Sequence, residues 1–170
     1  MSYFIIIRGP LGCGKSSISK IICEKLNAEY ISVDKILEEH ELEDDKEEGY
    51  ISQKSFLKAN EIAIKVSKPL LEKGKRVVFD GNFYWKSQLD DLTSKLKHPH
   101  KIFTLKAPLD VCIKRDSKRV PPHGKDATKA VYTKSTEYDA GINIDVTKPI
   151  DECIKDIFSY ADETRQHCLF

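Results

Sequence analysis

Short apolar runs alternate with longer amphipathic stretches along the whole chain. Runs rich in β-branched and aromatic residues predict five buried strands, at residues 3–7, 30–33, 76–79, 102–105 and 142–146. Between these runs apolar residues recur at helical spacing, as Ile18, Ile22 and Leu26 do after the first run. Strands that alternate with helices are typical of a parallel sheet. The pattern therefore predicts an α/β fold with a parallel sheet, in one domain spanning residues 1–170.

The expected helices differ in how clearly they end. Residues 52–72 form a long amphipathic stretch that Pro69 should kink or shorten, because a proline inside a helix removes a backbone hydrogen bond. Gly74 stands where a glycine commonly ends a helix. Residues 109–119 begin as a helix and run into the breaker sequence Val-Pro-Pro-His-Gly, whereas residues 150–161 carry a regular helical stripe.

The charge balance argues against a large polyanionic partner. The 170 residues include 28 lysines and arginines and 27 aspartates and glutamates, so the chain has no overall basic field. Binding to nucleic acid is therefore not favoured, although a local basic site remains open. Eight of the eleven residues at 38–48 are acidic, which is typical of a solvated helix end or a mobile surface loop.

Several features of the sequence favour a cytoplasmic protein. The apolar run near the start is only five residues long and leads into glycines, unlike a signal peptide. No apolar stretch approaches the roughly 20 residues that cross a bilayer, so no membrane is expected as a partner. The five cysteines are scattered and include no CxxC pair, which favours reduced, mostly structural thiols.

Residues 9–16 read Gly-Pro-Leu-Gly-Cys-Gly-Lys-Ser and match the full phosphate-binding loop pattern. Glycines let the backbone curl so that several N–H groups point at one anion, and the following helix N-terminus adds its dipole. Lys15 would place a positive charge near the β- and γ-phosphates, and the Ser16 hydroxyl would ligate Mg²⁺. ATP and Mg²⁺ are thus the expected cofactors, with GTP left open in place of ATP. The expected nucleotide-binding residues are Gly9, Gly12, Cys13, Gly14, Lys15, Ser16 and Ser17.

With this loop between a strand and a helix, the chain resembles the small-kinase branch of the P-loop proteins. That branch includes adenylate, shikimate, gluconate, adenylylsulfate and polynucleotide kinases. The resemblance implies a three-layer fold, with helices on both faces of a five-stranded parallel sheet in the order 2-3-1-4-5. It also implies an acceptor site beyond strands two and three, and a mobile lid at about residues 115–130. The implied activity is ATP- and Mg²⁺-dependent phosphoryl transfer.

Asp34 ends the second expected strand, in Tyr-Ile-Ser-Val-Asp-Lys. In kinases of this group that act on hydroxyls, an Asp at the matching place faces the acceptor. A carboxylate there can orient the hydroxyl and accept its proton, which would make Asp34 a catalytic base. The alternative is a helix N-cap, since Asp is a favoured cap and a helix is expected from Lys35.

Asp80 ends the third expected strand, which the resemblance places beside the phosphate-binding loop. Asp80 would hold Mg²⁺ through water or contact the acceptor, and the alternative is a simple turn residue. Asn82 and Tyr84 follow it and are candidates for the lining of the acceptor pocket. Trp85 could join them, but it also fits a core stripe with Leu89.

Arginine is absent between Arg8 and Arg76. Nucleoside monophosphate kinases grip the acceptor phosphate with arginines, whose bidentate contacts lysine cannot reproduce. A hydroxyl acceptor is therefore favoured, namely a small metabolite, a nucleoside or a polynucleotide 5′-end. A nucleoside monophosphate kinase is the first alternative. A regulatory module that binds a nucleotide and hydrolyses ATP slowly is the second.

Arg115 and Arg119 lie four residues apart, so on one helix they would share a face. The resemblance implies that arginines here close over the donor phosphates as catalytic lid residues, whereas the alternative is a solvated basic face. His123 is expected to be a loop residue. In the family, a loop at the position of residues 145–149 surrounds the adenine, but Thr147 could instead cap the last helix.

Overall fold

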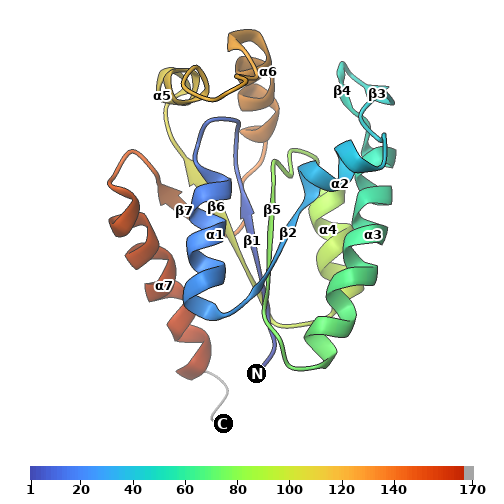
Figure 1. Ribbon diagram of the computed structural model, residues 1–170, viewed down its shortest axis with the longest axis vertical. Coiled ribbons are helices and arrows are strands. Elements are labelled where there is room, and N and C mark those ends of the chain that lie inside the picture. Colours follow the sequence, from blue (N-terminus) through green and yellow to red (C-terminus); the bar gives the residue numbers. More distant parts are fainter. Residues whose placement is uncertain (167–170) are drawn as a thin grey trace.

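Five parallel strands form the main sheet of the computed structural model, which describes residues 1–166 (Figure 1). The strands of this sheet are β1 (Phe4–Arg8), β2 (Glu29–Ser32), β5 (Val77–Gly81), β6 (His100–Lys106) and β7 (Ile142–Asp145). Their spatial order is β2-β5-β1-β6-β7. When the five strands of this sheet are numbered 1 to 5 along the chain, the order becomes 2-3-1-4-5. The expected strands and their order are therefore confirmed.

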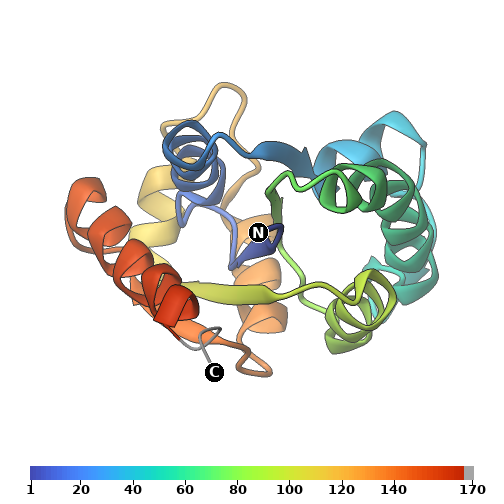
Figure 2. The same cartoon turned by 90° about the horizontal axis from the view of Figure 1, so that it is seen from below.

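Helices cover both faces of the sheet (Figure 2). The helices are α1 (Lys15–Leu26), α2 (Val33–Glu39), α3 (Gln53–Glu72), α4 (Lys86–Leu96), α5 (Leu109–Asp116), α6 (Lys125–Ser135) and α7 (Ile150–Gln166). One apolar cluster joins α1 and α7 to the sheet, and a second joins α2, α3 and α4 to the other face. Helices α5 and α6 lie beyond one end of the strands (Figure 1).

The central strand β1 contributes to both clusters. Ile5 and Ile7 face α1 and α7, whereas Phe4 and Ile6 face α3 and α4, and all four side chains are buried. Side chains alternate between the faces of a strand, so a strand covered on both faces is apolar throughout. This explains why the first strand appears in the sequence as an unbroken apolar run.

The carboxyl ends of β2, β5 and β1 meet at one edge of the sheet. Ser32 of β2 pairs with Asp80 of β5, and Gly81 of β5 pairs with Arg8 of β1. The loops that follow these strands therefore converge at this edge, where ligands bind in open α/β sheets. The expected site residues on these loops lie within reach of one another for this reason.

A short antiparallel hairpin follows α2, formed by β3 (Lys46–Glu47) and β4 (Tyr50–Ile51). Its two turn residues, Glu48 and Gly49, have φ of 54° and 83°, as a tight two-residue hairpin turn requires. The hairpin takes in the last three residues of the acidic run 38–48. The hairpin is an element that the sequence analysis did not predict for those three residues.

Helix α3 corrects one expectation and supports another. Pro69 does not shorten the helix, which continues to Glu72 although proline has no N–H to donate to the carbonyl of Lys65. Gly74 follows the helix with φ of 81°. The N–H groups of Gly74 and Lys75 donate to the carbonyls of Leu71 and Leu70, as in a Schellman motif.

Four of the five cysteines are buried free thiols, at Cys13, Cys23, Cys112 and Cys153. Cys168 lies outside the described residues. Within residues 1–166, no helix has both the length and the apolar character needed to span a bilayer. The compartment remains a prediction from the sequence.

Candidate functional site

The loop between β1 and α1 forms an anion cradle. Gly14 is the N-cap of α1 with φ of 88°, and no acidic side chain lies in the first turn of the helix. The first N–H groups of α1 therefore remain available to a phosphate. Lys15 is 7% exposed, and its Nζ donates to the carbonyl of Pro10 at 2.8 Å, which places the ammonium group over its own loop.

Gly12 is required at its position for steric reasons. Its φ is 74°, and a Cβ added there would lie 2.2 Å from the backbone oxygen of Cys112. We expect Gly12→Ala to lower the free energy of unfolding by roughly 2–4 kcal/mol, from the clash and the left-handed backbone together. Gly74→Ala is the matched control, because Gly74 has φ of 81° but open space around it, so about 1 kcal/mol is expected. Urea titrations measure both, and equal losses would contradict this account.

Asp80 lies beside the cradle, as expected. Its Oδ2 accepts from the Ser16 hydroxyl at 2.9 Å and from the Tyr30 hydroxyl at 2.6 Å. Burial and this bond to Asp80 raise the pKa of Tyr30, so the phenol remains a donor. Asp80 is 3% exposed, yet its Oδ1 is buried and accepts no hydrogen bond from the described residues. A hydroxyl beside a buried carboxylate with one unused oxygen fits a Mg²⁺ ion held by Ser16 directly and by Asp80 through water.

We expect Asp80→Asn to weaken the Mg²⁺ dependence of nucleotide binding. Removing a group that contacts a metal through a bound water commonly lowers the metal affinity by about 10- to 100-fold. The Mg²⁺ concentration that half-saturates binding of AMPPNP should therefore rise at least about tenfold in calorimetric titrations. Asp151→Asn, an exposed carboxylate in the first turn of α7, is the control. An unchanged Mg²⁺ midpoint in the Asp80 variant would refute the assignment.

Asp34 is not a helix cap. The N-cap of α2 is Ser32, whose side chain accepts from the N–H of Lys35 at 3.3 Å. The capping alternative is therefore wrong, and the Asp34 carboxylate is available for other partners. Burial raises its pKa above the ordinary value, the positive charge of Lys15 opposes this, and the Asp80 carboxylate adds to it. The backbone N–H of Asn82 also opposes the rise in the pKa of Asp34.

A cavity of about 510 Å³ lies over the cradle. It brings together residues from loops far apart in the sequence, namely Gly12, Gly14, Lys15, Ser16, Ser17, Asp34, Arg115, Arg119 and His123. Lysine and arginine surround the place where a triphosphate would lie on the loop, and Asp34 contributes a carboxylate to the same space. The expected catalytic residues Lys15, Asp34, Arg115 and Arg119 therefore share one cavity.

The two arginines reach this cavity from different local structures. Arg115 lies in the last turn of α5, and its Nη2 donates to the carbonyl of Val146 at 2.6 Å. Arg119 lies in the turn that follows, because α5 ends at Asp116. The expectation that both arginines share one helix face is therefore wrong. The exposed side chain of Arg119 nevertheless lines the cavity.

Asp116 organises the loop after α5, a role that the sequence analysis missed. It is 2% exposed, and its carboxylate accepts from the N–H groups of His123 and Gly124 and hydrogen-bonds His123 Nδ1 at 2.7 Å. Burial raises the pKa of Asp116, but these hydrogen bonds outweigh it and leave the pKa below its ordinary value. His123 lies in the loop, as expected, and its side chain is held at the cavity.

A second cavity, of about 330 Å³, adjoins the first and shares Asp34 and His123 with it. Asn82 and Tyr84 line this cavity, as expected for an acceptor pocket. Burial raises the pKa of Tyr84, whose hydroxyl accepts from the N–H of Ile51 at 3.1 Å. Trp85 packs into the core with Leu89 and Leu92, which supports the core interpretation of that residue.

A third cavity, of about 180 Å³, lies between the cradle and α7, beside Gly14, Ser17 and Val146. This is where the resemblance places the adenine. Thr147 does not cap α7, because this helix begins at Ile150, three residues further along the chain. The N–H and hydroxyl of Thr147 instead donate to Asp145 Oδ1, at 2.9 and 2.6 Å. The capping alternative is wrong for Thr147 as well. Cys13 also lines this cavity and is 1% exposed, and burial raises the pKa of its thiol.

Arg8, which the sequence analysis did not single out as a site residue, ties the end of β1 to the end of α6. It is fully buried, donates to Thr104 Oγ1 at 3.1 Å and to the carbonyl of Ser135 at 2.9 Å, and lies 4.2 Å from the Tyr138 ring centre. Burial lowers the pKa of Arg8. These contacts of Arg8 hold the carboxyl end of α6 against the end of β1.

Comparisons with known proteins agree with this geometry. The gluconokinase from Sinorhizobium meliloti 1021 is 16% identical with a TM-score of 0.72, and each chain covers 96% of the other. A sugar kinase from Janibacter sp. HTCC2649 is 15% identical with a TM-score of 0.78, and 95% of each chain is covered. The APS kinase from Mycobacterium tuberculosis, solved with AMPPNP and APS, is 15% identical with a TM-score of 0.75, over 95% of this chain and 98% of that one.

At these identities the likeness concerns the fold, and the resemblance to the small P-loop kinases is confirmed at that level. No curated protein matches the sequence significantly. A family model described as an AAA domain matches residues 4–138, which include the cradle, Asp34, Asp80, Arg115 and Arg119. That match spans well over half of the chain, and the protein belongs to this AAA-domain family.

Proposed function

We propose that the protein is an ATP- and Mg²⁺-dependent kinase that transfers the γ-phosphoryl group to a hydroxyl. One observation carries the proposal. Asp34, with its carboxylate not used as a cap, lines both the cavity over the cradle and the adjoining second cavity. A donor in the first cavity and an acceptor in the second would meet at this carboxylate.

In the proposed reaction the acceptor hydroxyl oxygen attacks the γ-phosphorus. The bond from the γ-phosphorus to the β–γ bridging oxygen breaks, and ADP leaves with the electron pair. Asp34 accepts the hydroxyl proton, and its raised pKa brings the carboxylate closer to the value that a general base needs. Lys15 and the loop N–H groups stabilise charge on the phosphates.

The remaining candidate residues have supporting roles in this proposal. Arg115 and Arg119 close the site on the donor side, where a segment at about 115–130 acts as the lid and excludes water. Ser16 and Asp80 would hold Mg²⁺, which neutralises phosphate charge when bound. The similar solved structures are kinases by name, which supports phosphoryl transfer as the reaction type.

A panel of acceptors incubated with γ-labelled ATP and Mg²⁺ tests the proposal. The expected result is label on an alcohol and little on nucleoside monophosphates. Label on monophosphates alone would favour the nucleoside monophosphate kinase. Label released only as inorganic phosphate, whatever acceptor is offered, would favour the regulatory module.

A further inference from the structure

We propose that the acceptor is an uncharged alcohol with a flat, mainly apolar body of about nucleoside size. This inference rests on the proposed kinase function and concerns the second cavity, which we call the acceptor pocket. Its volume of about 330 Å³ lies at the small end of the range for pockets that hold one small molecule. An extended polymer would not fit inside it.

The body of the acceptor would contact aromatic and small apolar side chains. Tyr50, Phe56 and Tyr84 line the acceptor pocket, and Tyr84 packs against the other two, with ring centres 5.6 Å apart for Tyr50 and Tyr84 and 5.1 Å for Phe56 and Tyr84. Ala127 and Ala130 of α6 contribute small side chains to the same lining. Aromatic rings beside small side chains favour an occupant with an apolar, planar ring.

The polar groups of the acceptor pocket suit a hydroxyl. Asp34 can accept a proton, and Asn82 is 8% exposed with a buried side-chain oxygen that accepts no hydrogen bond from residues 1–166. A buried acceptor of this kind is normally satisfied, and a donor group on the substrate would do so. Asn82 and Asp34 together could therefore accept hydrogen bonds from the reacting hydroxyl and from a second donor group of the substrate.

The charges of the acceptor pocket argue against an anionic acceptor. Among the described lining residues there is no arginine, and the one lysine, Lys46, is offset by Asp34 and Glu43. A phosphate or carboxylate bound there would meet carboxylates without a compensating bidentate cation. Monophosphates, sugar acids and the phosphodiester next to a polynucleotide 5′-end are all disfavoured for this reason.

The test compares kcat/KM across matched alcohols. Adenosine, cytidine and thymidine represent flat uncharged alcohols, and glucose and gluconate represent a sugar and a sugar acid. Nucleoside 3′-monophosphates keep the 5′-hydroxyl and add a charge. We expect at least one nucleoside to exceed both glucose and gluconate about tenfold, and to exceed its own 3′-monophosphate. Preference for glucose, gluconate or a 3′-monophosphate would overturn the acceptor class and leave the kinase standing, whereas failure with every alcohol would count against the proposed function itself.

A variant adds the cation that the acceptor pocket lacks. Ala130→Arg should raise kcat/KM for the 3′-monophosphate relative to its nucleoside by about tenfold, or about 1.4 kcal/mol, because arginine forms charge-assisted hydrogen bonds with a phosphate. Thr133→Arg, at an exposed position on the same helix, is the control and should leave the ratio unchanged. If both variants leave the ratio unchanged, the acceptor does not bind where we place it.

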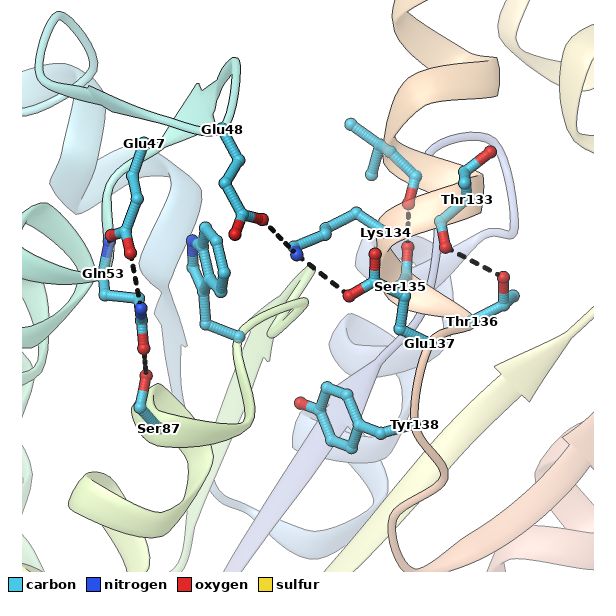
Figure 3. Close-up of polar contacts among 12 residues, drawn as sticks. Glu47, Glu48, Gln53, Ser87, Thr133, Lys134, Ser135, Thr136, Glu137 and Tyr138 are labelled. Atoms are coloured by element: carbon cyan, nitrogen blue, oxygen red, sulfur yellow. Dashed lines mark hydrogen bonds and ion pairs between the residues drawn. The ribbon is translucent and has the colours of Figure 1, made fainter.

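A different set of contacts supports a second inference, that Lys134 is a positioning residue for the acceptor pocket. Lys134 of α6 is 5% exposed and forms ion pairs with Glu48 of the hairpin at 3.0 Å and with Glu137 at 2.9 Å (Figure 3). Its Nζ also lies 4.0 Å from the Trp85 ring centre and 5.4 Å from that of Tyr50. We call the Lys134–Glu48 pair the clasp.

The backbone at Glu48 indicates that its side chain matters there. Glu48 has φ of 54°, a left-handed conformation that Asn or Gly adopts far more readily in a tight hairpin turn. Such a residue persists where its surroundings hold it. The ion pair with Lys134 holds Glu48 in this conformation, since the turn directs the Glu48 carboxylate at the ammonium group (Figure 3).

The other side of the hairpin is tied to α3 and α4. Gln53 donates through its backbone N–H and side-chain amide to Glu47, at 3.0 and 2.7 Å, and accepts from the Ser87 hydroxyl at 2.5 Å (Figure 3). The clasp therefore connects α6, which follows the lid arginines, to a hairpin fixed on the core. Tyr50 and Ala130, both lining the acceptor pocket, lie on the two parts that the clasp joins.

Lys134→Met and Glu48→Asn test the clasp. Asn favours the left-handed turn, so Glu48→Asn removes the ion pair without weakening the hairpin backbone. Both variants should raise KM for the best alcohol of the panel about tenfold and leave the Kd of AMPPNP within twofold. Lys75→Met, which breaks the exposed Lys75–Glu29 ion pair before β5, is the control and should change neither.

Hydrogen exchange on the protein alone gives a readout that needs no acceptor. Both clasp variants should speed exchange at residues 46–51 and 125–135, and Lys134→Arg should restore protection. An unchanged KM together with unchanged exchange in both variants would overturn the inference. A parallel rise in the Kd of AMPPNP would also overturn it, because the defect would then not be confined to the acceptor side.

Discussion

Replacing Lys15 by alanine should lower kcat for phosphoryl transfer by at least about 10²- to 10³-fold and leave the fold intact. Lys15 lies in the first turn of α1, in the cavity that Ser16, Arg115 and Arg119 also line. Its ammonium group is 2.8 Å from the Pro10 carbonyl, close to where the phosphates would lie on the loop. A positive charge placed there before the reaction stabilises the charge of the transferring group without reorganisation.

The Lys15 prediction is checked by steady-state kinetics beside thermal unfolding. Lys20→Ala is the matched control, because Lys20 lies on the same helix with an exposed side chain. Its kcat should stay near that of the unaltered protein. A Lys15→Ala variant that is folded and retains most of its activity would contradict a catalytic role for the cradle.

Replacing Asp34 by asparagine should lower acceptor-dependent turnover by about 10²- to 10⁴-fold, the usual contribution of a general base. The slow hydrolysis of ATP that the protein catalyses without an acceptor should change little, because this reaction removes no proton from an acceptor hydroxyl. Asn keeps the size of the side chain, and α2 keeps its Ser32 cap, so the helix should remain in place. The variant therefore separates proton transfer from structure.

The pH profile provides a second reading of Asp34. A base must be deprotonated, so turnover falls as pH drops through its pKa. Burial raises this pKa above the ordinary value of 3.8, and the acidic limb of kcat/KM should therefore lie above that value and vanish in the asparagine variant. Asp90→Asn, which alters an exposed carboxylate paired with Lys86, should preserve the limb. An equal loss of hydrolysis and transfer in Asp34→Asn would contradict a role for Asp34 that is confined to the acceptor proton.

The features that the sequence predicts well are those encoded locally. The cradle is contiguous from Gly9 to Ser16, and the run at residues 4–7 is apolar because both faces of β1 are buried. Strand order followed from the resemblance once the loop had been found. Helix α3 ends at Glu72, just before Gly74 as expected, because a single glycine in the left-handed conformation is enough to end a helix.

The features that the sequence analysis missed depend on distant partners or on near-equal local choices. Ser32 and Asp34 are both good caps two residues apart, and the structure selects Ser32. Strands of two residues, such as those of the hairpin, carry no periodic signal. Lys134 and Glu48 are 86 residues apart, and their contact becomes visible only when α6 and the hairpin are placed together.

Phosphorus NMR of one reaction tests the central claim most directly. The protein is incubated with ATP, Mg²⁺ and the mixed panel of alcohols and monophosphates, and the fate of the γ-phosphate signal is followed. The account predicts that this signal is replaced by a phosphomonoester signal from a phosphorylated alcohol, and that Asp34→Asn suppresses it. A product signal from a new phosphoanhydride alone, or from inorganic phosphate alone, would contradict transfer to a hydroxyl.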